Sequence, residues 1–102
     1  MSKYDITNSE LKVMSAIWDS ESLTMNELTD ILKKNKSTIK TYVYRLERKN
    51  IIKVDKDVNP YRYTYNLQKE DYIQEKAKYY IQNLFDGDKE KLIDVIEDIN
   101  LK

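Results

Sequence analysis

Apolar residues recur at helical spacing in three stretches of the first fifty residues. They lie between residues 11 and 18, between 28 and 32 and between 39 and 46, at intervals of three or four positions. Such stripes are typical of amphipathic helices that bury one face. The sequence therefore predicts three short helices in the N-terminal half of the chain.

Each predicted helix has a recognisable beginning. The pairs Thr7–Glu10 and Thr24–Glu27 precede the first two stripes, and this spacing is the pattern of a capping box. Asn35 is a favourable N-cap for the third helix, which is predicted to run to Lys49. Asn50 can then end that helix in a left-handed conformation.

Two later segments have the pattern of strands. Residues 51–54 are rich in β-branched side chains, and residues 61–65 alternate between tyrosine and polar residues. The stretch Asp57–Pro60 between them supplies turn residues, so the strands are predicted to pair as a hairpin. We expect the three tyrosines to form one packed face of it. The prediction is a mainly α fold with a small β-hairpin, the winged helix-turn-helix.

Helical spacing returns after Lys69 in two further stripes, which Gly87 separates. These helices have more apolar surface than the winged domain needs, which favours a homodimer over folding back on their own domain. The predicted organisation is a winged-helix DNA-binding domain at 1–67 and a helical dimerisation region at 68–102. The predicted dimer interface consists of Ile73, Ala77, Tyr80, Ile81, Leu84, Leu92, Val95, Ile96 and Ile99.

The formal net charge is zero, but the charges are unevenly distributed. Residues 33–53 contain eight lysines and arginines and one carboxylate, a net charge of +7. Residues 1–32 contain two lysines and six carboxylates, a net charge of −4. A basic segment beside an acidic one favours a local phosphate-binding surface, and a merely solvated lysine-rich helix is the alternative.

The polar face of the third helix carries hydroxyls and cations, which suit a nucleic acid. Arginine and lysine can neutralise phosphates or donate to guanine, and threonine can meet the thymine methyl group. Lys49, near the helix end, is expected to contact phosphate only, and the hairpin tip to reach the adjacent backbone or minor groove. The predicted DNA-binding residues are Lys36, Ser37, Thr38, Lys40, Thr41, Tyr44, Arg45 and Arg48 on the helix and Lys56, Asn59 and Arg62 on the hairpin.

Composition disfavours several classes of protein. The chain has no cysteine and no histidine, which removes thiolate metal sites, disulfides and the most common general base. The carboxylates are expected on solvent-facing helix positions, so we predict no enzyme, no metal site and no cofactor. No apolar run approaches the ~20 residues of a membrane span, which predicts a cytoplasmic protein without a membrane partner.

Several motifs resemble those of one repressor family. The run Glu10–Met14 followed by Ile17–Trp18, the segment Ser37–Thr41 followed by Arg45–Leu46, and the strand Tyr61–Tyr65 are similar to the penicillinase and methicillin-resistance repressors of the BlaI, MecI and CopY type. The resemblance implies a homodimeric transcriptional repressor that binds a palindromic operator. By resemblance, the family's DNA-contacting positions would be occupied by Ser37, Thr38, Lys40, Thr41 and Arg45.

Two other functions remain open from the sequence. One is a ligand-sensing winged-helix regulator of the MarR or PadR sort, with a small-molecule cavity between the dimer helices and the DNA-binding domain. The other is a winged-helix interaction module that binds protein and no DNA, which the neutral total charge permits. Steep weakening of DNA binding as salt rises would separate a DNA-binding protein from such a module.

Overall fold

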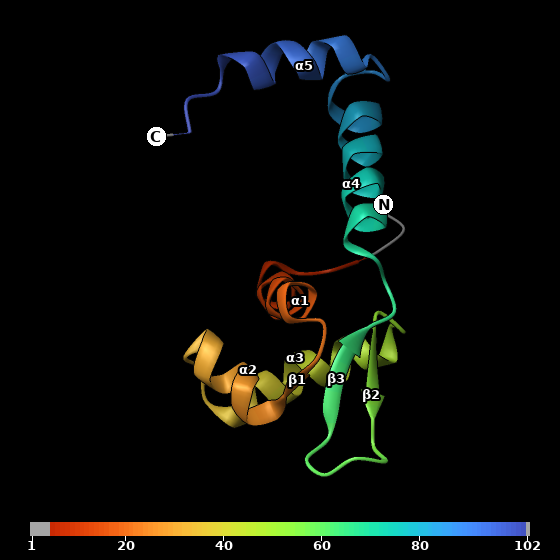
Figure 1. The fold of residues 1–102 in the computed structure, drawn as a ribbon. Coiled ribbons are helices and arrows are strands. Elements are labelled where there is room, and N and C mark those ends of the chain that lie inside the picture. The colour runs from red at the N-terminus through yellow and green to blue at the C-terminus, as the bar shows by residue number, and fades with distance from the viewer. Residues whose placement is uncertain (1–4, 102) are drawn as a thin grey trace. The chain divides into compact units, whose positions relative to one another are not determined.

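The computed structural model describes residues 5–101, which form five helices and three short strands. The elements are α1 (Asn8–Ser20), β1 (Leu23–Thr24), α2 (Met25–Leu32), α3 (Lys36–Arg48), β2 (Ile52–Asp55), β3 (Arg62–Tyr65), α4 (Lys69–Leu84) and α5 (Lys89–Asp98) (Figure 1). Residues 6–69 form one compact unit, and residues 70–101 belong to a second. The predicted regions 1–67 and 68–102 include residues 1–4 and 102, which lie outside the described residues.

The predicted helix starts are confirmed. Thr7 Oγ1 accepts a hydrogen bond from Glu10 N at 3.1 Å, and Glu10 Oε1 accepts one from Thr7 N at 3.0 Å. Thr24 and Glu27 form the same reciprocal pair at 3.2 and 2.8 Å. Each box satisfies backbone donors that the first turn of a helix leaves without a partner. Asn35 caps α3, as predicted, by accepting from Thr38 N at 2.9 Å.

The core of the first unit lies among α1, α2 and α3. Its central side chains come from α1, α2 and α3, and all are at most 4% exposed: Val13, Met14, Ile17, Leu28, Ile39, Val43 and Leu46. Ile31, which belongs to the predicted apolar stripe of α2, is 51% exposed instead. Burying an aliphatic side chain of this size stabilises a fold by roughly 1.5–3 kcal/mol, so this cluster dominates the stability of the unit. Trp18 Nε1 donates to the Leu67 carbonyl at 2.9 Å, and this hydrogen bond links the segment that follows the hairpin to α1.

The sheet has one strand more than the sequence predicted. Strands β2 and β3 pair as the expected antiparallel hairpin, and β1 adds to the free edge of β3 to give the order β1-β3-β2. The third strand is only two residues long, with Leu23 opposite Tyr63 and Thr24 opposite Arg62. A segment of this length has too few positions for an alternating pattern, so the sequence pattern does not predict this strand.

The predicted tyrosine face is confirmed only in part. Tyr63, at the centre of β3, is buried, and Tyr65 is half-buried. Tyr61 lies before the first residue of β3, in the loop that joins β2 to β3, and 47% of its surface is exposed. Because Tyr61 lies outside the strand, it does not take part in the alternation of buried and exposed side chains along β3.

The second unit contains the two helices that the sequence predicted after Lys69. Gly87, with φ of +80°, separates α4 from α5, and Asp88 caps α5 by accepting from Glu90 N at 3.0 Å. Ile99, predicted within the last helix, is its C-cap residue. Among the described residues, no helix is long and apolar enough to cross a membrane.

Candidate nucleic-acid interface

Helix α3 presents one polar face to solvent. Because the side chains of Ile39, Val43 and Leu46 are buried, the residues on the opposite side of the helix point outward. The predicted DNA-binding residues of α3 are exposed at Lys36, Ser37, Lys40, Thr41, Tyr44, Arg45 and Arg48 and half-buried at Thr38. The structure therefore brings these eight side chains together on one helix.

Local contacts orient several of these side chains. Ser37 Oγ donates to Asn35 Oδ1 at 2.9 Å, and Thr41 Oγ1 donates to the Ser37 carbonyl at 3.1 Å. The hydroxyl proton of Thr41 is thus donated within the helix. The oxygen lone pairs and the methyl group of Thr41 remain available to a partner. The Arg48 guanidinium lies 5.8 Å from the centre of the Tyr44 ring, where cation–π attraction holds it along the helix surface.

The hairpin loop lies beside this face. A surface hollow separates α3 from the hairpin, and its rim includes Lys40 and Tyr44 from the helix and Lys56 and Tyr61 from the loop. Lys56 Nζ lies 3.8 Å from Glu47 Oε2, so one exposed ion pair bridges the loop and the helix. Lys56 and Asn59 are exposed, which leaves both predicted wing residues accessible.

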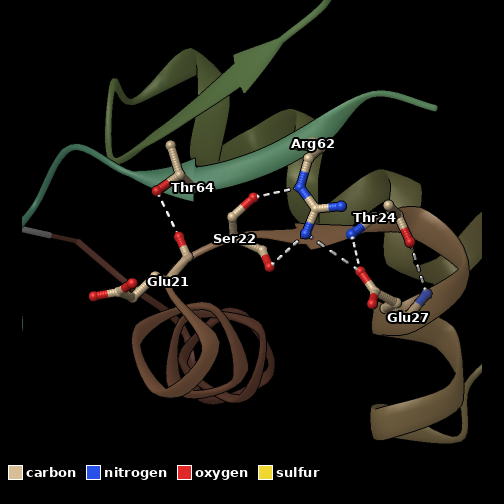
Figure 2. Close-up of polar contacts among 6 residues, drawn as sticks. All are labelled: Glu21, Ser22, Thr24, Glu27, Arg62 and Thr64. Atoms are coloured by element: carbon tan, nitrogen blue, oxygen red, sulfur yellow. Dashed lines mark hydrogen bonds and ion pairs between the residues drawn. The ribbon is translucent and has the colours of Figure 1, made fainter. Parts of the chain in front are cut away.

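Arg62 has a different environment from the other predicted residues. Its Nε donates to Ser22 Oγ at 2.7 Å, its Nη2 donates to the Ser22 carbonyl at 3.0 Å, and Nη2 lies 3.7 Å from Glu27 Oε1 (Figure 2). The guanidinium is therefore directed toward Ser22 and the start of α2.

An ion pair joins the first turn of α1 to the end of α3, and no local pattern in the sequence predicts it. The side chain of Glu10 is 0% exposed, and its Oε1 lies 2.9 Å from Lys49 Nζ. This corrects the expectation that the carboxylates all face solvent. The expected phosphate contact of Lys49 stays a prediction, and within the chain its ammonium group pairs with the carboxylate of α1. Burial raises the pKa of Glu10, but the hydrogen bond from Lys49, the bond to Thr7 and the nearby cations outweigh it and hold the pKa below its usual value.

Apolar side chains are exposed in the second unit. The predicted interface residues are 44–69% exposed at Ile73, Tyr80, Leu84, Val95, Ile96 and Ile99 and half-buried at Ala77, Ile81 and Leu92. Isolated exposed apolar residues are normal, but a series along two consecutive helices is typical of an interaction surface. Within residues 5–101, no group of three or more carboxylates could hold a metal ion.

Comparison with known proteins identifies the family. Residues 6–99 match the family model described as penicillinase repressor. The chain belongs to this family. It is 34% identical to the penicillinase repressor of Staphylococcus aureus over 87% of this chain and 74% of that protein. It is 31% identical to the penicillinase repressor of Bacillus licheniformis over 80% of this chain and 67% of that protein.

Solved structures confirm the winged-helix fold of this penicillinase repressor family member. The DNA-binding domain of the repressor BlaI superposes with a TM-score of 0.59 and 31% identity, over 71% of this chain and 94% of that domain. The oxidised form of MarR from E. coli superposes with a TM-score of 0.62 over 91% of this chain and 74% of MarR. MarR is only 20% identical, so its likeness concerns the fold alone.

Proposed function

We propose that this chain is a transcriptional repressor that binds double-stranded DNA by placing the exposed face of α3 in the major groove. The observation that carries the proposal is that face itself. It gathers cations and hydroxyls within one basic segment of net charge +7, on the side of the helix opposite its buried residues. Membership of the penicillinase repressor family and the likeness to the BlaI DNA-binding domain support the same role.

The two kinds of side chain on α3 would have different tasks. Arg45 can donate two hydrogen bonds to the edge of a guanine, and Thr41 can place its methyl group against thymine, so both are assigned to base recognition. Lys36, Lys40 and Arg48 are assigned to phosphates, which position the helix without reading sequence. Lys56 and Asn59 on the wing would contact the adjacent backbone or minor groove, because the hairpin loop lies beside α3.

Two copies of the chain would bind one operator. The exposed apolar residues of α4 and α5 are proposed to pair with the same helices of a second copy, because association removes their surface from water. An isologous dimer presents two recognition helices related by a two-fold axis, so the expected operator is palindromic. Joining the helices makes the second contact intramolecular, which raises the affinity for a paired site.

The first prediction tests base recognition. Thr41→Ala and Arg45→Ala should each weaken binding to the preferred duplex by about 1–3 kcal/mol and weaken binding to random DNA much less, because base-edge contacts exist only on the correct sequence. The preferred duplex is obtained by selecting bound molecules from a random pool with the wild-type protein. Affinities for the selected duplex and for a shuffled duplex are then measured by fluorescence anisotropy.

The matched control for this experiment is Lys12→Ala. Lys12 is an exposed residue of α1, so the variant removes a positive charge as Arg45→Ala does but leaves α3 unchanged. It should have almost no effect on the preference for the selected duplex. Equal losses on both duplexes for Thr41→Ala and Arg45→Ala would show that these residues do not read bases. Failure of the wild type to enrich any sequence would overturn the proposed function.

A further inference from the structure

The turn between α1 and β1 has an unusual backbone. Glu21 follows α1 with φ of 67° and ψ of −39°, and Ser22 N donates to the Ser20 carbonyl at 2.8 Å. These values describe a three-residue γ-turn of the less common hand, which is strained for any residue other than glycine. Such a conformation persists only where the surrounding structure holds it.

Two side chains of β3 hold this turn. Thr64 Oγ1 donates to the Glu21 carbonyl at 2.6 Å, and Arg62 donates to the hydroxyl and the carbonyl of Ser22 at 2.7 and 3.0 Å (Figure 2). Because Arg62 and Thr64 are two positions apart in one strand, they project from the same face of β3. The strand that leads out of the wing is thereby attached to the turn that precedes α2.

Arg62 extends this attachment to α2. Its Nη2 lies 3.7 Å from Glu27 Oε1, and the same carboxylate oxygen accepts a hydrogen bond from Thr24 N at 2.8 Å to cap the helix. Helix α2 in turn packs against α3. One guanidinium therefore connects the wing strand, the strained turn and the helix that supports α3.

The backbone contribution to this connection is small. Strand β1 has two residues, and its pairing with β3 consists of Leu23 opposite Tyr63 and Thr24 opposite Arg62. A pairing of this length opens easily at its ends, so side-chain contacts supply much of the restraint on the wing. This restraint acts together with the Lys56–Glu47 ion pair to hold the exposed loop residues Lys56 and Asn59 beside α3.

We propose that Arg62 is a positioning residue of the DNA-binding surface, which fixes the wing relative to α3 through Ser22 and Glu27 and does not itself contact phosphate. The proposal rests on the proposed function of α3 and the wing. It assigns the positive charge of Arg62 to the protein's own Glu27 carboxylate and Ser22 oxygens, and it leaves DNA contact at the wing to Lys56 and Asn59.

The second prediction compares Arg62→Lys with Arg62→Ala. Lysine keeps the positive charge but lacks the planar fork that donates to two Ser22 atoms at once, so both variants should release the wing. If the wing is correctly placed in only about a tenth of the variant molecules, the apparent affinity for the selected duplex falls about tenfold. The dependence of affinity on salt should stay as in the wild type, because no phosphate contact is lost. Titrations of the full chain across salt concentrations measure both quantities.

A measurement without DNA separates positioning from loss of overall stability. In the free Arg62→Lys protein, amide hydrogen exchange should accelerate at residues 21–24 and stay unchanged at Val13–Ile17 in the core of α1. General destabilisation would accelerate exchange in both segments. Ser22→Ala removes one acceptor without changing any charge, so it should accelerate exchange at residues 21–24 and lower the affinity for the selected duplex to a smaller extent.

Lys56→Ala is the reference for a phosphate contact at the wing, and it should lower the salt slope by about one for each subunit. If Arg62→Ala lowers the slope in the same way and Arg62→Lys keeps wild-type affinity, Arg62 contacts phosphate and the positioning role is wrong. The role is also wrong if Arg62→Lys leaves exchange and affinity unchanged. A wild-type protein that binds no DNA would instead contradict the proposed function, while faster local exchange in Arg62→Lys would still support the attachment of the wing.

Discussion

Replacing Lys49 by alanine should destabilise the protein by about 3 kcal/mol, which is a large loss for a domain of this size. The cause is the carboxylate that remains. Glu10 is 0% exposed, and its second oxygen, Oε2, is buried with no hydrogen-bond partner among the described residues. Lys49 Nζ lies 2.9 Å from Glu10 Oε1, and its removal leaves the buried carboxylate with only the hydrogen bond from Thr7 and the charge of Arg45. Urea denaturation at pH 7 measures the loss.

The same variant should weaken the pH dependence that Glu10 gives to the free energy of unfolding. In the wild type the folded-state pKa of Glu10 is below its usual value, so its contribution is present above the unfolded pKa and is lost as the pH falls through the folded pKa. Without Lys49, burial still raises the pKa of Glu10 while two of the effects that lower it are lost, so the folded-state pKa should rise. Acidification toward pH 4 should then reduce the difference in the free energy of unfolding between Lys49→Ala and the wild type.

Two further variants control for other causes. Lys40→Ala removes an exposed cation from the same helix and should change stability by no more than about 0.5 kcal/mol. Glu10→Gln combined with Lys49→Ala replaces the buried charge by a neutral amide, which can still serve in a capping box, so most of the loss should be recovered. A cost for Lys49→Ala equal to that of Lys40→Ala would show that the buried pair contributes nothing particular.

The residues of this ion pair show what the sequence could predict and what it could not. Glu10 was correctly identified as the third residue of a capping box, because that role depends only on the spacing from Thr7. Its ion-pair partner Lys49 lies 39 positions later in the chain, and the packing of α3 on α1 brings the two side chains together. Local patterns therefore predicted the helix start, but the charge environment of its carboxylate follows from tertiary packing.

The hairpin shows the same division between local and tertiary information. Alternation predicted β3 and the burial of Tyr63, and turn residues predicted the connection to β2. The charge of Arg62 and its place near the predicted wing tip predict a contact with DNA, and within the chain its guanidinium binds Ser22, 40 positions earlier. No pattern around Arg62 distinguishes a cation that meets phosphate from one that binds its own chain. The face of α3 was easier to predict, since helical periodicity alone determines which side chains lie opposite the buried stripe.

Helices α4 and α5 are the opposite case, because their apolar pattern is clear and the partner proposed for it is a second chain. Their apolar spacing predicted amphipathic helices, and the structure leaves Ile73, Leu84 and Ile96 more than half exposed. An amphipathic helix is stabilised mainly by what covers its apolar face. A second copy of the chain is the proposed cover, and one charged substitution on this face tests it.

Ile96→Asp should convert the proposed dimer to monomer at micromolar concentration and lower the affinity for a palindrome by a factor on the order of 10² to 10⁴. Ile96 is 55% exposed in the single chain, so an aspartate there stays hydrated and the fold of residues 6–69 should be retained. In the dimer the same carboxylate would enter an apolar interface without a partner, at a cost of several kcal/mol. Sedimentation velocity measures the state of association, and titrations onto a palindrome and onto a single half-site measure the affinity.

Gln82→Asp is the matched control, because it adds the same charge at an exposed position of α4 away from the apolar stripe. It should remain a dimer and keep the wild-type preference for the palindrome. For Ile96→Asp, affinity for the single half-site should stay close to that of the wild type, since each recognition helix is intact and only the intramolecular second contact is lost. Sedimentation of the wild type as a monomer, or an unchanged palindrome preference in Ile96→Asp, would contradict the pairing of α4 and α5, whereas loss of half-site binding as well would indicate damage to the winged domain.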